Sequence, residues 1–254
     1  MSDIQMTFKR YEMKYLLDPF KYQRLRRKLE GRLVVDEYGK KTVCNIYYDT
    51  PDSRLIRTSL EKPVYKEKLR LRSYGVAQKD GTVFLELKKK YKGVVYKRRE
   101  TMVLEEATQY LEAGETPGFD SQVLHEINWF LRYYKTIKPA MYISYERIAM
   151  YGVEDQELRV TFDTNILWRE EKMDLREEAW GNPILEPGQY LMEIKIAGSM
   201  PIWLSDILDE CEIYPSSFSK YGKAYLDKQL MAGEHAQYRD KENNLEQIGG
   251  SNCA

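Results

Sequence analysis

Residues 66–75 read KEKLRLRSYG, and this stretch is the strongest single indication of the fold. Lys68, Arg70 and Arg72 occupy alternate positions, with leucines between them. Successive side chains on a β-strand point to opposite faces of the sheet. The stretch therefore predicts a strand with one basic face and one apolar face.

The same alternation extends to most of the other strands that we expect. These strands fall at about residues 8–17, 41–50, 64–75, 82–91, 94–104, 139–152, 157–170 and 188–196. Asp80-Gly81 lies between two of these segments and indicates a hairpin. Helical spacing or capping residues predict helices at residues 18–31, 105–114, 120–137, 205–212 and 218–230. Charged residues alternate along the other strands at Arg10, Glu12, Lys14, Glu86, Lys88, Lys97, Arg99, Arg147, Arg159, Glu193 and Lys195.

A charged strand face is usually a solvated face, and this reading is the simpler one for any single strand. Cations on one face lie about 6.5 Å apart, and their repulsion costs roughly 0.6 kcal/mol per pair in bulk water but roughly 2.5 kcal/mol in a partly enclosed site. An enclosed row therefore needs an anion. The opposite faces, with leucines at 69, 71, 85 and 87, are strongly apolar and must be covered by helices. Helices on the apolar side turn the charged side inward.

These patterns predict the fold class α+β: an eight-stranded antiparallel β-barrel that forms a tunnel, with helices packed on its outside. We expect one domain over residues 1–230 and a polar, flexible tail over residues 231–254.

Composition limits the possible functions. The chain has 254 residues, and 40 basic residues balance 40 acidic ones, so no bulk basic field for nucleic acid exists. Three scattered cysteines suit a reducing, cytoplasmic location. No apolar run is long enough to span a bilayer, and two isolated histidines exclude a multi-histidine zinc site.

A basic lumen with a few carboxylates suits a polyphosphate and its metal ion. Cations neutralise phosphoryl oxygens, and carboxylates bind Mg²⁺ or Mn²⁺. The metal-ligand candidates are Glu193, Glu12 and Glu86, although Glu12 and Glu86 can equally serve only to balance nearby cations.

Several motifs occur in a characteristic order along residues 7–229. They are RYEMKY (10–15), KLRLRSYG (68–75), LELKKK (85–90), KRR (97–99), YERIAM (145–150), LRVTFD (158–163), LMEIKI (191–196) and SFSKYGKAY (217–225). Together they resemble the VTC domain, the polyphosphate polymerase domain of the triphosphate tunnel metalloenzyme (CYTH-like) superfamily. The resemblance implies a catalytic tunnel that binds the phosphates of a nucleoside triphosphate such as ATP and a growing polyphosphate chain.

The resemblance assigns residues by motif. Catalytic contacts to phosphate are implied for Lys14, Arg70, Arg72, Lys88, Arg147 and Arg159. Substrate binding is implied for Arg10, Lys68, Lys97, Arg99, Lys195, Ser219 and Lys220, with the choice between Lys97 and Arg99 left open. Glu193 matches the carboxylate that holds the divalent metal, and its structural alternative is an ion pair with Lys195. Arg159 can instead pair with Asp163.

Two departures from the family pattern stand out. Arg10 occupies the position of the first glutamate in the superfamily signature, which removes one possible metal ligand. Ser217 occupies a position that is basic in some members. Three functions remain open: phosphoryl transfer to polyphosphate, hydrolysis of tripolyphosphate or nucleoside triphosphate with water as acceptor, and polyphosphate binding without turnover. A membrane partner protein also remains open.

Overall fold

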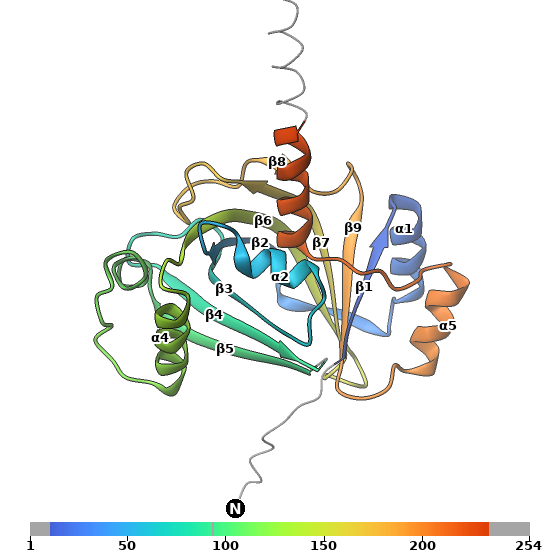
Figure 1. Cartoon of the computed structure of the whole chain (residues 1–254). Helices are drawn as coiled ribbons and strands as arrows, with labels where there is room; N and C mark the ends of the chain where they lie inside the picture. The colour runs from blue at the N-terminus through green and yellow to red at the C-terminus, as the bar shows by residue number, and fades with distance from the viewer. Residues whose placement is uncertain (1–10, 93, 234–254) are drawn as a thin grey trace, which may run out of the picture.

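The computed structural model describes residues 11–92 and 94–233. Its strands form one antiparallel sheet in the order β1-β9-β7-β6-β2-β3-β4-β5, and the short β8 pairs with β7 (Figure 1). The strands are β1 (Tyr11–Leu17), β2 (Leu33–Asp49), β3 (Tyr65–Tyr74), β4 (Thr82–Tyr91), β5 (Val94–Val103), β6 (Lys138–Gly152), β7 (Arg159–Arg169), β8 (Asn182–Pro183) and β9 (Tyr190–Ile196). The α+β class and the tunnel-like antiparallel sheet are therefore confirmed.

Backbone pairing between the described strands does not close the sheet into a continuous barrel. Within the described residues, β1 and β5 are the two ends of the strand order. A side-chain contact joins β1 to β4, the strand next to β5, since Nζ of Lys88 on β4 lies 3.3 Å from Oε2 of Glu12 on β1. Figure 1 shows the end of β4 and the beginning of β5 near the beginning of β1. The tunnel therefore has a seam that side chains hold together.

The helices are α1 (Pro19–Lys28), α2 (Arg54–Leu60), α3 (Leu104–Thr108), a π-helical turn η1 (Gln109–Ala113), α4 (Gln122–Tyr134), α5 (Ile202–Glu210) and a last helix over residues 220–233. Local sequence explains where α1 and α4 begin. Asp18 accepts a hydrogen bond from the backbone N–H of Lys21, and Ser121 accepts one from that of Leu124.

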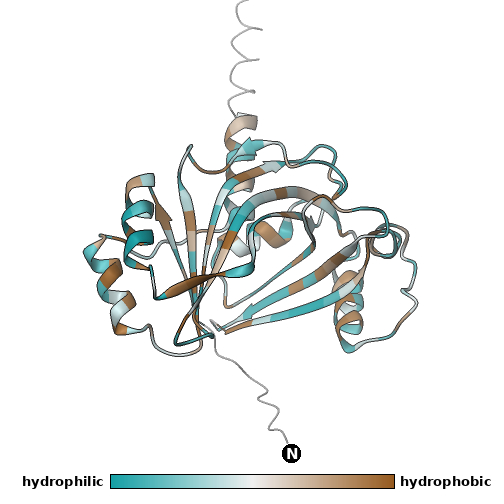
Figure 2. Cartoon of the chain, turned by 180° about the vertical axis from the view of Figure 1, so that it is seen from behind, coloured by the Kyte–Doolittle hydropathy of each residue, from teal (hydrophilic) through white to brown (hydrophobic). Residues whose placement is uncertain are grey.

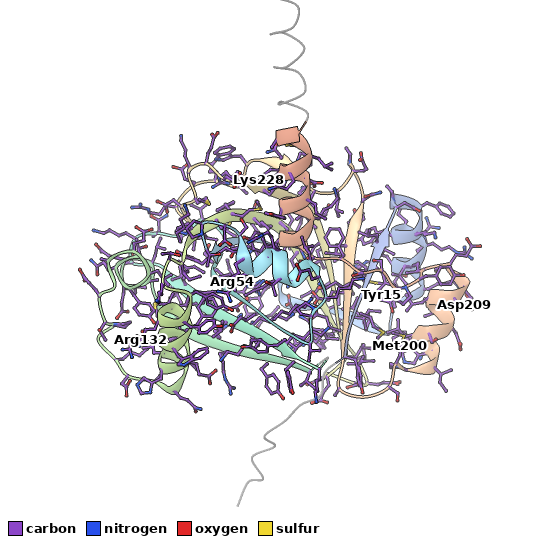
Figure 3. The ribbon with its side chains drawn as sticks, in the orientation of Figure 1. Tyr15, Arg54, Arg132, Met200, Asp209 and Lys228 are labelled. Carbon is purple, nitrogen blue, oxygen red and sulfur yellow. The ribbon has the colours of Figure 1, made fainter. Side chains whose placement is uncertain are left out.

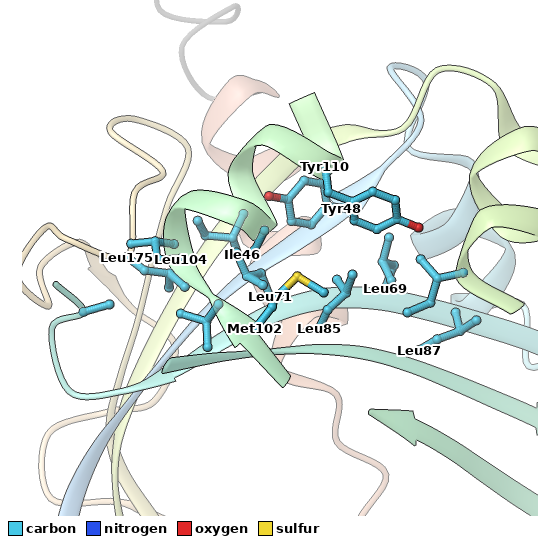
Figure 4. Close-up of a cluster of buried hydrophobic side chains, with 14 of the residues drawn as sticks. Ile46, Tyr48, Leu69, Leu71, Leu85, Leu87, Met102, Leu104, Tyr110 and Leu175 are labelled. Atoms are coloured by element: carbon cyan, nitrogen blue, oxygen red, sulfur yellow. The ribbon is translucent and has the colours of Figure 1, made fainter. Parts of the chain in front are cut away.

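Two apolar clusters lie on the outer face of the sheet, and helices cover both. Leucines of β3 and β4 pack with residues of α3, η1 and α4 in the first cluster, shown in Figure 4. Residues of β1, β7 and β9 pack with α1 and α5 in the second. Figure 1 accordingly places α4 beside β4 and β5, and α1 and α5 beside β1. Polar and apolar segments alternate along several strands in Figure 2, as this arrangement requires.

A third apolar cluster lies on the inner side and joins the last helix to the sheet. Tyr221 and Ala224 of this helix pack with Tyr47 of β2, Ile143 of β6 and Ile56 of α2. The rings of Tyr47 and Tyr221 stack with centroids 4.8 Å apart. The last helix is thus not on the outside with the other helices, because its first turn contacts the charged face.

Cys44 and Cys211 are both buried and free. None of the helices in the described part of the chain is both long enough and apolar enough to cross a bilayer.

Candidate active site in the tunnel

Glu86 on β4 is the centre of one group of charges. Its side chain is 1% exposed and lies 2.7 Å from Nη2 of Arg70 and 2.7 Å from Nζ of Lys97. Nε of Arg99 donates at 2.8 Å to Oε1, the oxygen that Lys97 also contacts, and Nη1 of Arg72 lies 3.9 Å from Oε2. Burial raises the pKa of Glu86, but these cations outweigh burial and hold the pKa well below its usual range.

The choice between Lys97 and Arg99 is resolved by strand register. On β5 they pair with Lys88 and Glu86 respectively, so both lie on the tunnel face. Arg98 between them points outward and donates to Glu126 of α4 at 2.9 Å. The tunnel therefore contains two cations from this strand.

Asp163 on β7 is the centre of a second group, and the sequence reading did not foresee its role. It is 0% exposed and accepts two hydrogen bonds from Arg147, at 2.6 and 2.8 Å. Nζ of Lys220 donates to it at 2.5 Å. Burial raises the pKa of Asp163, but Lys220 and Arg147 outweigh burial and lower it. Asp163 and Arg159 lie on the same face of β7, and this spacing indicated a pair between them. In the structure Asp163 pairs with Arg147 of β6 instead.

Glu12 on β1 and Glu193 on β9 form a carboxylate pair on neighbouring strands. Burial raises the pKa of Glu12, whereas a hydrogen bond with Glu193 and the charges of Lys88, Lys14 and Lys195 lower it well below its usual range. Glu193 also lies 3.7 Å from Lys195. Two carboxylates this close repel each other unless a proton or a metal ion lies between them.

The carboxylate pair fits Mg²⁺ or Mn²⁺. Such ions commonly use one or two protein carboxylates and complete their shell with water and phosphate oxygens. No larger cluster of acidic, histidine or cysteine side chains with metal-binding geometry occurs in residues 11–92 and 94–233. Glu86 is enclosed by cations instead, so its surroundings suit charge balance better than metal binding.

Lys14 and Lys68 connect the strands to the last helix. Nζ of Lys14 donates to the carbonyl of Phe218 at 3.0 Å, and Nζ of Lys68 donates to Oγ of Ser219 at 3.0 Å. Burial, followed by the nearby cations with Lys14 first, lowers the pKa of Lys68 to about 7. Burial likewise lowers the pKa of Lys97 to about 8, against the opposing effect of Glu86.

Polar side chains that the sequence reading missed position the arginines. Nε of Arg72 donates to Oδ1 of Asn45 at 2.9 Å, and Nη2 of Arg72 donates to Tyr145 at 3.2 Å. Nη1 of Arg70 donates to the hydroxyl of Tyr47 at 3.1 Å. Asn45 and Tyr47 lie two residues apart on β2 and therefore share a face. This alternation could have identified them as tunnel residues.

The remaining assigned residues lie in different places. Arg159 is exposed at the start of β7, where its cross-strand neighbours are Lys195 and Tyr151. Within the described residues Arg159 forms no hydrogen bond with Asp163, which accepts from Arg147 and Lys220. Arg10 lies outside the described residues. The structure thus gathers the assigned residues of β1, β3, β4, β5, β6 and β9 with the last helix around one lumen, and leaves Arg159 toward its edge.

Comparison with known proteins identifies the family. The family model of the VTC domain matches residues 9–227. The chain belongs to the VTC domain family. The comparison with curated proteins finds no match.

Solved structures are similar to this VTC domain. A proposed adenylate cyclase from Bacillus halodurans is 17% identical, with a TM-score of 0.51, and the match covers 83% of this chain and 95% of that one. A proposed adenylyl cyclase from Hippeastrum, described as having a dominant triphosphatase activity, is 17% identical, with a TM-score of 0.48 and coverage of 83% and 92%. The likeness to the Bacillus halodurans protein concerns the fold alone.

Proposed function

We propose that this VTC domain transfers the γ-phosphoryl group of a nucleoside triphosphate, such as ATP, to inorganic polyphosphate. The observation that carries the proposal is the lumen itself. It places the cations of six strands and the last helix around a single space and adds one carboxylate pair, Glu12 and Glu193, on neighbouring strands. A purely cationic lumen would bind phosphate but would not anchor a metal ion.

The residues of the lumen account for binding and alignment of the phosphates. Arg70 and Arg72 are held by Glu86, Asn45 and Tyr47, so their guanidinium groups are oriented before substrate arrives. Fixed donors of this kind stabilise charge on a transferring phosphoryl group without reorganisation during the reaction. Glu12 and Glu193 would hold Mg²⁺ or Mn²⁺, which when bound neutralises phosphate oxygens.

The proposed reaction needs little acid–base chemistry. An anionic oxygen at the end of the acceptor chain forms a bond to the γ-phosphorus, and the bond from this phosphorus to the bridging oxygen of the β-phosphate breaks. The nucleoside diphosphate leaves with that oxygen and its electron pair. The acceptor is already deprotonated, so positioning and charge stabilisation carry the rate.

Hydrolysis is the second candidate function. In that case water replaces the polyphosphate acceptor, and a carboxylate has to orient it. Glu12 is favoured for this role over Glu86, because Glu86 is enclosed by four cations. Incubation of the purified chain with ATP and Mn²⁺ separates the two functions: a polymer ladder on a gel supports transfer, whereas free phosphate without polymer contradicts it and supports hydrolysis.

A second experiment tests the location of the site. Arg70→Ala combined with Arg72→Ala should abolish binding of tripolyphosphate in calorimetry. Arg98→Ala is the matched control, because Arg98 belongs to the outer face and pairs with Glu126. Unchanged affinity in the double variant would place the phosphate site elsewhere. Circular dichroism verifies that the double variant is folded.

A further inference from the structure

A cavity lies outside the tunnel, where α2, β3 and α4 meet. Its volume is about 300 Å³, and its lining residues are Arg54, Leu55, Thr58, Tyr65, Lys66, Glu67, Trp129, Tyr133 and Tyr134. In Figure 3, Arg54 and Arg132 mark α2 and α4, the two helices that border it. Tyr65 and Glu67 alternate with the tunnel residues of β3, so this cavity belongs to the outer face of the sheet.

Aromatic side chains form its exposed wall. Trp129 is 58% exposed and Tyr133 is 53% exposed, and their rings stack with centroids 5.2 Å apart. Tyr65 and Val64 add further exposed apolar surface at the start of β3. Single exposed apolar residues are ordinary, but a group from two elements around one cavity marks an interaction site.

The base of the cavity is rigid. Glu67 is 3% exposed, and its two oxygens accept hydrogen bonds from the hydroxyls of Tyr134, at 2.7 Å, and Tyr65, at 2.9 Å. These bonds fix both tyrosine rings. Glu67 is the single acidic group among the described lining residues, against the two cations Arg54 and Lys66.

The charge at the mouth is positive. The guanidinium of Arg54 lies over the rings of Tyr133 and Tyr134, at 5.9 and 5.5 Å from their centroids. Lys66 is the second cation of the lining, and its Nζ donates to the backbone carbonyl of Ser59 at 3.1 Å. Arg57 of α2 pairs with Asp52, whereas neither Arg54 nor Lys66 forms a salt bridge within the described part of the chain.

We propose that this cavity docks an acidic segment of another protein, which inserts one apolar or aromatic side chain between Trp129, Tyr133 and Tyr65. Tryptophan, tyrosine and arginine are the residues that contribute most to binding at protein interfaces, typically around a pocket that receives an anchor side chain. The unpaired cations at the rim select acidic flanking residues. A recessed, rigid cavity suits a side-chain anchor better than it suits a bilayer surface. This proposal is independent of the reaction in the tunnel.

The test uses the full chain as bait for a phage library of random peptides. Selected peptides are then synthesised, and their affinities are measured by fluorescence anisotropy. We expect peptides with aspartate or glutamate around an apolar anchor. We expect Trp129→Ala and Arg54→Glu each to weaken them about tenfold or more, a change of about 1.4 kcal/mol. Phe20→Ala and Arg27→Glu, both on the exposed surface of α1, are matched controls that should change affinity less than about twofold.

Other outcomes would overturn the proposal. A selection that yields no peptide, or only peptides insensitive to Trp129→Ala, removes the docking site. Binding to phosphatidylserine vesicles that Trp129→Ala abolishes assigns the cavity to a membrane surface. A dimer in light scattering that Trp129→Ala dissociates assigns it to a second copy of the chain. Retained tripolyphosphate binding in the variants establishes that they are folded.

Discussion

Lys88 on β4 donates a hydrogen bond of 3.3 Å to Glu12 on β1, and these two residues join strands that lie near opposite ends of the strand order. Glu12 is also 3.5 Å from Lys14 on its own strand. The pair therefore closes the tunnel beside the carboxylates that are proposed to bind metal. Both side chains are partly exposed, so the pair contributes little to global stability, typically below about 1 kcal/mol.

Lys88→Met should therefore affect binding more than stability. The variant loses one cation of the lumen and the side-chain bridge across the seam. We expect affinity for tripolyphosphate to fall about tenfold, equivalent to about 1.4 kcal/mol, with little change in the unfolding midpoint. Calorimetric titration measures the affinity. Lys89→Met is the control, because Lys89 lies on the outer face and pairs with Glu126.

Glu193→Gln should separate metal binding from phosphate binding. The substitution removes one carboxylate charge from the pair with Glu12 but leaves the cations that bind phosphate. We expect Mn²⁺ affinity, measured by electron paramagnetic resonance, to fall at least about tenfold, with tripolyphosphate binding largely retained and metal-dependent turnover lost. Glu86→Gln is the informative comparison: equal loss of Mn²⁺ affinity in that variant would show that the metal lies at Glu86.

Asp163→Asn should destabilise the fold. Arg147 and Lys220 would remain buried together without their carboxylate, and breaking a buried ion pair from one side typically costs about 3 kcal/mol. Urea unfolding followed by fluorescence measures the change. The exposed Asp206→Asn on α5 serves as control. Tripolyphosphate should restore part of the lost stability, since an anion in the lumen compensates the same cations.

Phosphate binding should take up protons near pH 8. The free protein holds Lys68 with a pKa of about 7, below its ordinary value of 10.5, so this group is mostly neutral at pH 8. A bound polyanion favours the charged form, and the complex therefore carries more protons than the free protein. The sign follows: affinity falls as pH rises above about 7.

Calorimetry in buffers of different ionisation enthalpy measures this uptake. Lys97, with a pKa of about 8, contributes in the same direction. Lys68→Met should reduce the uptake and flatten the pH dependence. Uptake that is equal in wild type and Lys68→Met would assign the proton to another group.

Much of the site could be predicted from period-two alternation, because a residue's face on a strand depends only on its position in the alternation. Lys68, Arg70 and Arg72 on β3 illustrate this. What could not be predicted is which strands face each other across the lumen. Glu86 belongs with the arginines and Glu12 with Glu193 because of register and curvature, which arise from packing of the whole sheet rather than from any local segment.

The last helix shows the same limit. Its apolar residues indicated a packed helix, but the pattern could not reveal that Tyr221 packs against Tyr47 on the inner side of the sheet. Likewise, Asp163 looked like a partner for Arg159, which is the nearer residue in sequence. The actual partner, Arg147, lies opposite Asp163 across the β6–β7 ladder.

The internal carboxylates make the tunnel resemble an ion exchanger, in which an incoming anion competes with resident anions for the same cations. Glu86 and Asp163 are fixed counterions of the arginines and lysines around them. The binding free energy of an incoming anion is therefore only the difference between its attraction to these cations and that of the resident carboxylates. Monovalent anions such as chloride offer little advantage over a carboxylate already in place, whereas linked phosphates can engage several cations together, so we expect the lumen to prefer linked phosphates to monovalent anions.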